Sequence, residues 1–175
     1  NVDGACISFY PNPFAMYEGS YGLMIKFEVS IAIEKPVEEV FEFVAEGENG
    51  SKWNSAVKSV RKISEGPVNV GTKYSMIRQL SNGSAENTYE VVEYEENKKI
   101  SIKIISGPTP FLYKYSFKPF DKGTDLSLEA EAEKEGLIEV LGTKARIAPE
   151  FVLGGFIKRG VEQNFQTLKS LLESS

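Results

Sequence analysis

The apolar residues change their spacing from two positions to nearly four in a short stretch around residue 35. Before it, Phe27, Val29, Ile31 and Ile33 alternate with polar residues, which predicts a half-buried strand. After it, apolar side chains recur at helical spacing, which predicts a short amphipathic helix with Pro36 in its first turn. The apolar stripe of that helix comprises Val37, Val40, Phe41 and Val44. Because so short a helix is marginal alone, it must pack on the rest of the chain.

The segment after Trp53 has the pattern of a series of short strands divided by turn signals. We expect strands at 57–64, 71–80, 84–94, 99–106, 111–120 and 124–135. Asn82-Gly83 is typical of a tight hairpin, and Asp121-Lys122-Gly123 turns the chain again. Connections this short favour an antiparallel meander, whose sheet curls because its strands twist.

The last part of the chain has the pattern of a long amphipathic helix. From 148 to 172 most apolar residues fall on one broad stripe, and Pro149 suits the first turn. The pair Gly154-Gly155 inside it costs about 2 kcal/mol relative to two alanines. That cost indicates close approach to the sheet or to a ligand, or a kink. We interpret 137–147, which precedes the helix, as a loop with a helical turn.

The composition is typical of a globular protein, and the charge argues against two classes of binding partner. Residues 1–23 show no period, and we interpret them as an extension before a domain at 24–175. A net charge of −5 and a pI near 5.0 argue against a nucleic-acid surface and against binding to anionic membranes. No apolar run approaches the length of a membrane span. The single cysteine, Cys6, excludes an intrachain disulfide, which suits a reducing compartment and predicts a cytoplasmic protein.

The absence of histidine limits the chemistry of this chain more than any residue that is present. Without imidazole there is no Ser–His or Cys–His pair, and no His-based zinc or iron site. The chain also lacks the glycine fingerprint of dinucleotide-binding folds and the phosphate-binding loop that ends in Gly-Lys-Ser/Thr. We therefore assign no catalytic residue, no metal site and no cofactor.

The order of the elements and several short motifs carry a resemblance to a known superfamily. In chain order the motifs are Ile31-Ala-Ile-Glu-Lys-Pro36-Val-Glu-Glu-Val40-Phe41, Trp53, Val70-Gly71-Thr72, Tyr115-Ser-Phe117-Lys-Pro119, Gly123-Thr124 and the amphipathic terminal helix. Over residues 24–173 the chain resembles the START-like, helix-grip superfamily (SRPBCC), also called the polyketide-cyclase/dehydrase and lipid-transport superfamily. The resemblance implies an α+β helix-grip fold: a curved antiparallel sheet of about seven strands around the long C-terminal helix, with one or two short helices after the first strand.

The same resemblance implies a cavity between the sheet and the C-terminal helix that takes an apolar guest. The residues expected to line it are Trp53 at the mouth, Tyr74, Met76, Arg78, Tyr89, Val91, Ile104, Tyr113, Tyr115 and Phe117 on the sheet, and Phe151, Gly155, Ile157 and Val161 on the helix. Arg78 could hold a carboxylate or phosphate head group by a forked hydrogen bond. Any one of the aromatic residues is more typical of core packing, and a register shift of one residue would turn Arg78 to solvent.

Fold alone does not decide the activity. We favour a non-catalytic binder or carrier of a small hydrophobic molecule that is lipid-, polyketide- or isoprenoid-like. The alternative is a polyketide cyclase-, aromatase- or dehydratase-like enzyme that uses Tyr113, Tyr115, Arg78 or a glutamate such as Glu90 instead of histidine. A second alternative is a protein-interaction role such as chaperone activation. A homodimer through sheet edges or through the extension is compatible with all three.

Overall fold

The computed structural model describes residues 24–80, 83–109, 111–134, 137–138, 142 and 144–174. The predicted extension at 1–23 and Asn82 of the predicted hairpin turn lie outside the described residues. The described elements are β1 (Met24–Ile33), α1 (Val37–Ala45), η1 (Gly47–Asn49), α2 (Gly50–Trp53), β2 (Val57–Lys62), β3 (Lys73–Leu80), β4 (Gly83–Glu95), β5 (Lys99–Ser106), β6 (Phe111–Phe120), β7 (Gly123–Glu133), α4 (Lys144–Ile147) and α5 (Glu150–Glu173). Helix α4 supplies the helical turn that we expected between 137 and 147.

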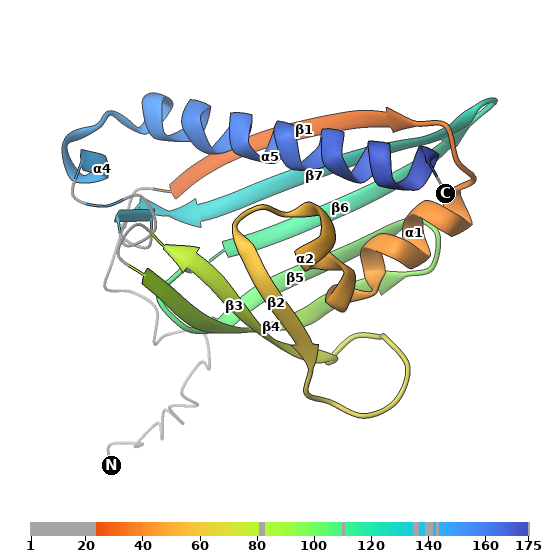
Figure 1. Cartoon of the computed structure of the whole chain (residues 1–175), viewed down its shortest axis with the longest axis horizontal. Coiled ribbons are helices and arrows are strands. Elements are labelled where there is room, and N and C mark those ends of the chain that lie inside the picture. Colours follow the sequence, from red (N-terminus) through yellow and green to blue (C-terminus); the bar gives the residue numbers. More distant parts are fainter. Residues whose placement is uncertain are drawn as a thin grey trace, which may run out of the picture.

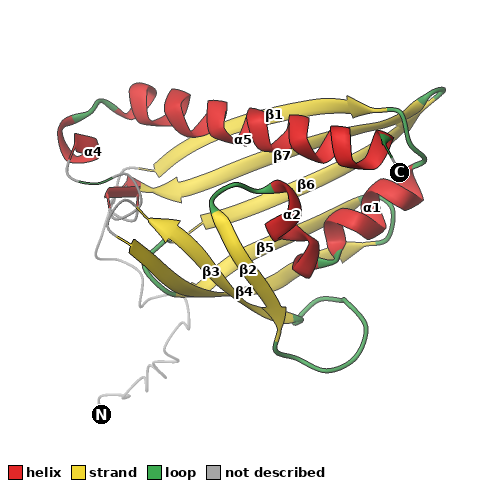
Figure 2. Ribbon diagram, in the orientation of Figure 1, coloured by secondary structure: helices red, strands yellow, loops and turns green. Residues whose placement is uncertain are grey.

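The strands form one seven-stranded antiparallel sheet in the order β1-β7-β6-β5-β4-β3-β2. The sheet is curved, and α5 runs along β1 (Figure 1). Figure 2 shows α1 and α2 on the same face of the sheet as α5. The predicted α+β helix-grip fold is confirmed, including the short helices after the first strand.

The change of spacing near residue 35 marks the junction between β1 and α1. Alternate residues of β1 face the core, and its last residue, Ile33, is fully buried and pairs with Thr124 of β7. Pro36 is the residue before the first helical one, with φ −54° and ψ 148°, one position earlier than we predicted. The helix then buries Phe41, whose ring makes edge contacts with Phe117 at 5.0 Å and Tyr94 at 5.4 Å between centroids. This packing fixes α1, and therefore the turns that follow it, on the sheet.

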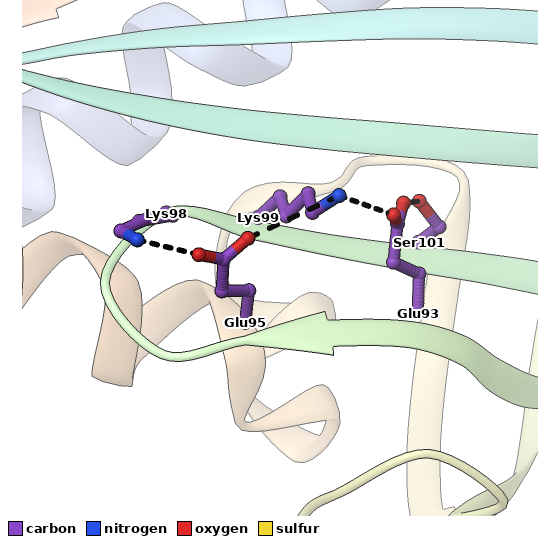
Figure 3. Close-up of polar contacts among 5 residues, drawn as sticks. All are labelled: Glu93, Glu95, Lys98, Lys99 and Ser101. Carbon is purple, nitrogen blue, oxygen red and sulfur yellow. Dashed lines mark hydrogen bonds and ion pairs between the residues drawn. The ribbon is translucent and has the colours of Figure 1, made fainter.

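A bulge and a polar network set the register of the β4–β5 hairpin. The pairing shifts between Val91 and Glu93, which leaves Val91 buried while Val92 is exposed. Beyond the bulge, the carboxylate of Glu93 accepts hydrogen bonds from Lys99 Nζ at 2.5 Å and Ser101 Oγ at 2.9 Å (Figure 3). The bond from Lys99, and then that from Ser101, lowers the pKa of Glu93 below its usual value. These contacts hold the two strands in the pairing that keeps the inner face apolar.

The last helix presents one stripe to the sheet, as its sequence predicts. The half-buried and buried positions of that stripe are Leu153, Ile157, Val161, Phe165, Leu168 and Leu172. A Cβ on Gly154 would lie 3.4 Å from Ile25 Cγ2 of β1, whereas a Cβ on Gly155 would meet no atom within 4 Å. Close approach to the sheet therefore explains Gly154 only. Gly155 is exposed, and no contact of the described residues requires a glycine there.

We expect Gly155→Ala to raise the free energy of unfolding by about 0.5–1 kcal/mol, because alanine has the higher helix propensity and meets open space. Gly154→Ala is the matched control, and its gain should be smaller because the new methyl group touches Ile25. Urea unfolding followed by circular dichroism would measure both variants. A loss of stability in Gly155→Ala would show that this glycine has a role beyond the contacts described here.

Within the ranges that the structure describes, no helix has the length and apolar character needed to cross a membrane.

Candidate ligand-binding cavity

An interior cavity lies between the inner face of strands β2 to β6 and the segment from α1 to α2. Its lining comprises Val44, Ala45, Gly47, Gly50, Trp53, Asn54, Val57, Val60, Tyr74, Met76, Arg78, Tyr89, Val91, Ile100, Ile102, Ile104, Phe111, Tyr113 and Tyr115. The volume that the centre of a water molecule can occupy in the cavity is about 70 Å³. All the empty space between the lining atoms, including the part that opens to solvent, is about 740 Å³. The cavity is partly open and mostly apolar, with a few polar side chains among its walls.

The structure brings together most of the residues that we expected on the sheet side of the cavity. Those that line it are Trp53, Tyr74, Met76, Arg78, Tyr89, Val91, Ile104, Tyr113 and Tyr115. They meet because alternate residues of β3 and β4 face inward, and the β2–β3 and β3–β4 registers put Arg78 opposite Val57 and Ala85. That these side chains contact a ligand stays a prediction.

The residues expected from α5, and one from the sheet, lie elsewhere. Phe117 packs against Phe41 in the main core. Phe151 is 81% exposed, and with Gly155 it borders a separate groove along the start of β1. Ile157 and Val161 pack against the two core clusters and do not line the cavity. The helix packs on β1 at the edge of the sheet, so its stripe covers this part of the core instead of the cavity.

The segment after α1 forms a wall of the cavity that the sequence pattern did not predict. Gly47, Gly50 and Asn54 line the cavity, although their Gly/Asn/Ser-rich surroundings have the pattern of an ordinary loop. Five residues of the predicted strands also line the cavity, although we did not expect them there: Val57, Val60, Ile100, Ile102 and Phe111. Strict alternation with Tyr113 and Tyr115 was the signal that could have added Phe111.

Gly47 closes one end of the cavity against two stacked tyrosines. The rings of Tyr74 and Tyr89 stack with centroids 4.9 Å apart and planes 15° apart. The Tyr74 hydroxyl donates to Glu46 Oε1 at 3.4 Å. A Cβ on Gly47 would lie 2.1 Å from the Tyr89 hydroxyl and 2.8 Å from a ring carbon of Tyr74. Only glycine lets this turn approach the tyrosines so closely.

Arg78 is the one cation in the cavity wall formed by the described residues, and it is 7% exposed. Its guanidinium carbon lies 4.9 Å from the ring centroid of Phe111, and its charge acts on the nearby Tyr113 hydroxyl. Its Nε atom has no hydrogen-bond partner among the described residues, and neither has the indole N–H of Trp53. Two residues that line the cavity thus each have a buried donor without a partner, and a buried donor without a partner is destabilising.

The tyrosines of the cavity are hydrogen-bonding groups and not bases near neutral pH. Burial, and then the nearby Glu46 carboxylate, raises the pKa of Tyr74 to about 12. Burial raises the pKa of Tyr89 and Tyr115 further. Burial also raises the pKa of Tyr113, although the charge of Arg78 acts in the opposite direction. Glu90, the carboxylate that we considered for catalysis, lies outside the cavity lining and pairs with Lys73 Nζ at 3.9 Å.

Comparison with known proteins identifies the family. The family model described as polyketide cyclase / dehydrase and lipid transport matches residues 24–173. The chain belongs to this family. No curated protein sequence matches the chain.

Solved structures of other proteins share the fold of this polyketide cyclase/dehydrase and lipid-transport family member. A START superfamily protein from Mycobacterium smegmatis superposes with a TM-score of 0.69 at 14% identity, covering 86% of this chain and 98% of that one. The protein TTHA0849 from Thermus thermophilus gives 0.68 at 13% identity, with 85% and 97% covered. The Zhui aromatase/cyclase from a Streptomyces species gives 0.66 at 14% identity, with 86% and 94% covered. At these identities the likeness shows the fold alone.

In this family member an asparagine of α5 ties the helix to the cavity wall beside Trp53. Asn164 is buried on the apolar stripe of α5. Its Oδ1 accepts from the backbone N–H and the hydroxyl of Ser55, each at 3.1 Å, and its Nδ2 donates to Asn54 Oδ1 at 3.1 Å. A polar residue on a helical apolar stripe was the available sequence signal. The contact makes the position of α5 matter for the cavity although α5 does not line it.

The buried phenols of this polyketide cyclase/dehydrase family member predict a loss of stability at alkaline pH. Tyrosines of the unfolded chain ionise near their ordinary value of 10.0, but Tyr89 and Tyr115 keep their protons to higher pH in the folded chain. The unfolded state therefore loses protons first, and the free energy of unfolding should fall as the pH rises above about 10. Urea unfolding at several alkaline pH values, with phenolate absorbance as a second probe, measures the slope. Tyr89→Phe should flatten it, and an unchanged slope would contradict this assignment.

Proposed function

We propose that the protein binds and carries a small hydrophobic molecule in this cavity, of lipid-, polyketide- or isoprenoid-like character. The observation that supports it most is the lining: apolar walls with a few placed polar groups, in a space that is partly open. Membership of a family described by polyketide cyclase, dehydrase and lipid transport agrees with such a guest.

The size of the cavity sets a condition on this proposal. About 70 Å³ of space for water centres suits a few waters, whereas a typical ligand pocket holds about 300–1,000 Å³. A larger guest must therefore displace part of the wall. The wall from Gly47 to Gly50 belongs to the short helices η1 and α2. We infer that a guest enters the cavity by displacing this part of the wall. Binding should then slow hydrogen exchange in residues 46–53.

The lining also favours binding over acid–base catalysis. Its ionisable groups are Arg78 and four tyrosines, and burial raises the pKa of each tyrosine above an ordinary value that is already far from 7. A cyclase-like reaction there would have to rely on hydrogen bonds from Tyr113, Tyr115 and Arg78. Tyr115→Phe separates the two hypotheses, because it should leave binding within about a few-fold but abolish turnover if the hydroxyl does chemistry. A partner-binding role, our third hypothesis, predicts a complex that survives filling of the cavity.

Native mass spectrometry of the full chain, purified without denaturant, tests the proposal. We expect a co-purifying apolar molecule in the wild-type protein. Val60→Phe places extra volume in the cavity and should raise the Kd of the guest about tenfold or more, a loss of at least about 1.4 kcal/mol of binding free energy, and so lower the occupied fraction. Val92→Phe makes the same substitution on the exposed face of β4 and should leave occupancy unchanged. Wild-type protein that is repeatedly recovered empty, and that binds no added fatty acid or aromatic polyketide, would overturn the proposal.

A further inference from the structure

Arg78 lies in the cavity wall without an acidic partner among the described residues, and this bears on the chemical class of the guest. Among the ion pairs found in the described residues, none involves Arg78. We propose that the guest is an amphipathic carboxylic acid whose carboxylate binds the Arg78 guanidinium and whose apolar body fills the rest of the cavity. This inference rests on the proposed function and names its ligand class.

Arginine brings a permanent positive charge to the cavity wall. Arginine does not lose its proton in proteins, so burial cannot be relieved by neutralisation as it can for lysine. A buried charge without a counter-charge is strongly destabilising, even after relaxation of its surroundings. Arg78 lies on the inner face of β3 and is 7% exposed, so its charge lowers the stability of the fold unless an anion shares the cavity.

The neighbours of Arg78 compensate this cost only in part. The face of Phe111, 4.9 Å from the guanidinium carbon, offers a cation–π contact but no negative charge. Tyr113 offers a hydroxyl that stays neutral, since burial raises its pKa. Nε remains without a partner. Nε and one terminal nitrogen form an edge with two parallel N–H groups, the arrangement that a carboxylate accepts with both oxygens.

The charge of the lining favours a single negative charge on the guest. Of the described residues that form the wall, Arg78 is the only charged one, with neither a carboxylate nor a lysine beside it. A carboxylate balances one guanidinium, whereas a phosphate monoester near pH 7 carries close to two charges. The remaining wall, including Val60, Ile100 and Ile102, is apolar and suits a hydrocarbon or aromatic body.

The single tryptophan makes the test direct. Trp53 lines the cavity, so its fluorescence reports on a bound guest without a label. We would titrate the full chain with lauric acid, lauryl alcohol and methyl laurate, which share one apolar chain and differ in the head group. Lauric acid should bind at least about tenfold more tightly than the alcohol or ester at neutral pH, as a charge-assisted pair requires. The difference should vanish when the pH falls below the pKa of the free acid.

Two variants test whether Arg78 causes the preference for the acid over the alcohol and the ester. Arg78→Met removes the charge but keeps an unbranched side chain, and it should abolish the preference for the acid. Arg61→Met is the matched control, because Arg61 is exposed on β2 and should leave the preference intact. The wild-type comparison of acid, alcohol and ester needs no variant, so it decides even if Arg78→Met fails to fold.

The outcomes separate this inference from the function on which it rests. Equal affinity for acid, alcohol and ester, or a preference that Arg78→Met retains, overturns the carboxylate inference and leaves the carrier proposal standing. A co-purified guest that is neutral does the same. If no probe binds and no guest co-purifies, the carrier proposal itself fails. A guest extracted as an acid, which loses affinity when methylated, supports the inference even if lauric acid proves too long or too flexible.

Discussion

Replacing Phe41 by alanine should lower the free energy of unfolding by about 3–5 kcal/mol, the usual cost of removing a buried aromatic ring. Phe41 is 2% exposed and packs edge-on against Phe117 of β6 and Tyr94 of β4. Together with the fully buried Val40, it packs α1 on the sheet. A domain of this kind is stable by about 5–15 kcal/mol in total, so the loss is a large fraction. Urea unfolding monitored by circular dichroism would measure it.

The variant should also weaken binding of a guest, because the cavity wall from Gly47 to Trp53 follows directly from α1. Phe43→Ala is the matched control. Phe43 lies on the same helix but is half-buried, and its ring faces Lys52 Nζ at 5.7 Å from the centroid. Its loss should cost about 1 kcal/mol or less. Equal effects of the two substitutions would contradict the view that Phe41 anchors α1.

Replacing Gly123 by alanine should destabilise the protein by about 3 kcal/mol or more, because the new methyl group has no room. A Cβ at this position would lie 2.0 Å from the carbonyl oxygen of Ile33 and 2.9 Å from the Cα of Glu34. These are backbone atoms of the β1 end, and they cannot rotate aside as a side chain would. Next to it, the Thr124 hydroxyl donates to the Lys35 carbonyl at 2.8 Å, so the junction has little freedom.

Gly155→Ala is the internal control for Gly123→Ala, since it introduces the same methyl group where no atom lies within 4 Å. The two substitutions should change stability in opposite directions. Denaturant midpoints of both variants, measured side by side, decide the matter. If Gly123→Ala folds with the stability of the wild type, then the β6–β7 turn does not pack on the end of β1 as described.

The proposed carrier function depends on a narrow cavity that has to widen. The apolar lining, the unsatisfied donors of Arg78 and Trp53, and the neutral tyrosines all favour a guest with a polar head and an apolar body. The short elements at Gly47 and Gly50 form the part of the wall that we expect to move.

The sheet-side part of the candidate site was predictable because a strand has a strict period of two. Once Tyr74 faces the interior, Met76 and Arg78 must do so as well, and the same holds for Tyr113 and Tyr115 on β6. The helix-side part was not predictable in the same way. The stripe of α5 shows which face is buried, but not which strands it covers, since that depends on contacts far apart in the chain.

The sequence by itself determined the order of the elements, the inward faces of the strands, the apolar stripe of the last helix and the family resemblance. These follow from local spacing and from the periods of strands and helices. Only the tertiary structure decided that α5 lies along β1, that Gly47 closes the cavity against Tyr89, and that Arg78 has no acidic partner among the described residues. Such features arise where distant segments meet, and the free energy of each contact depends on atoms that no local pattern records.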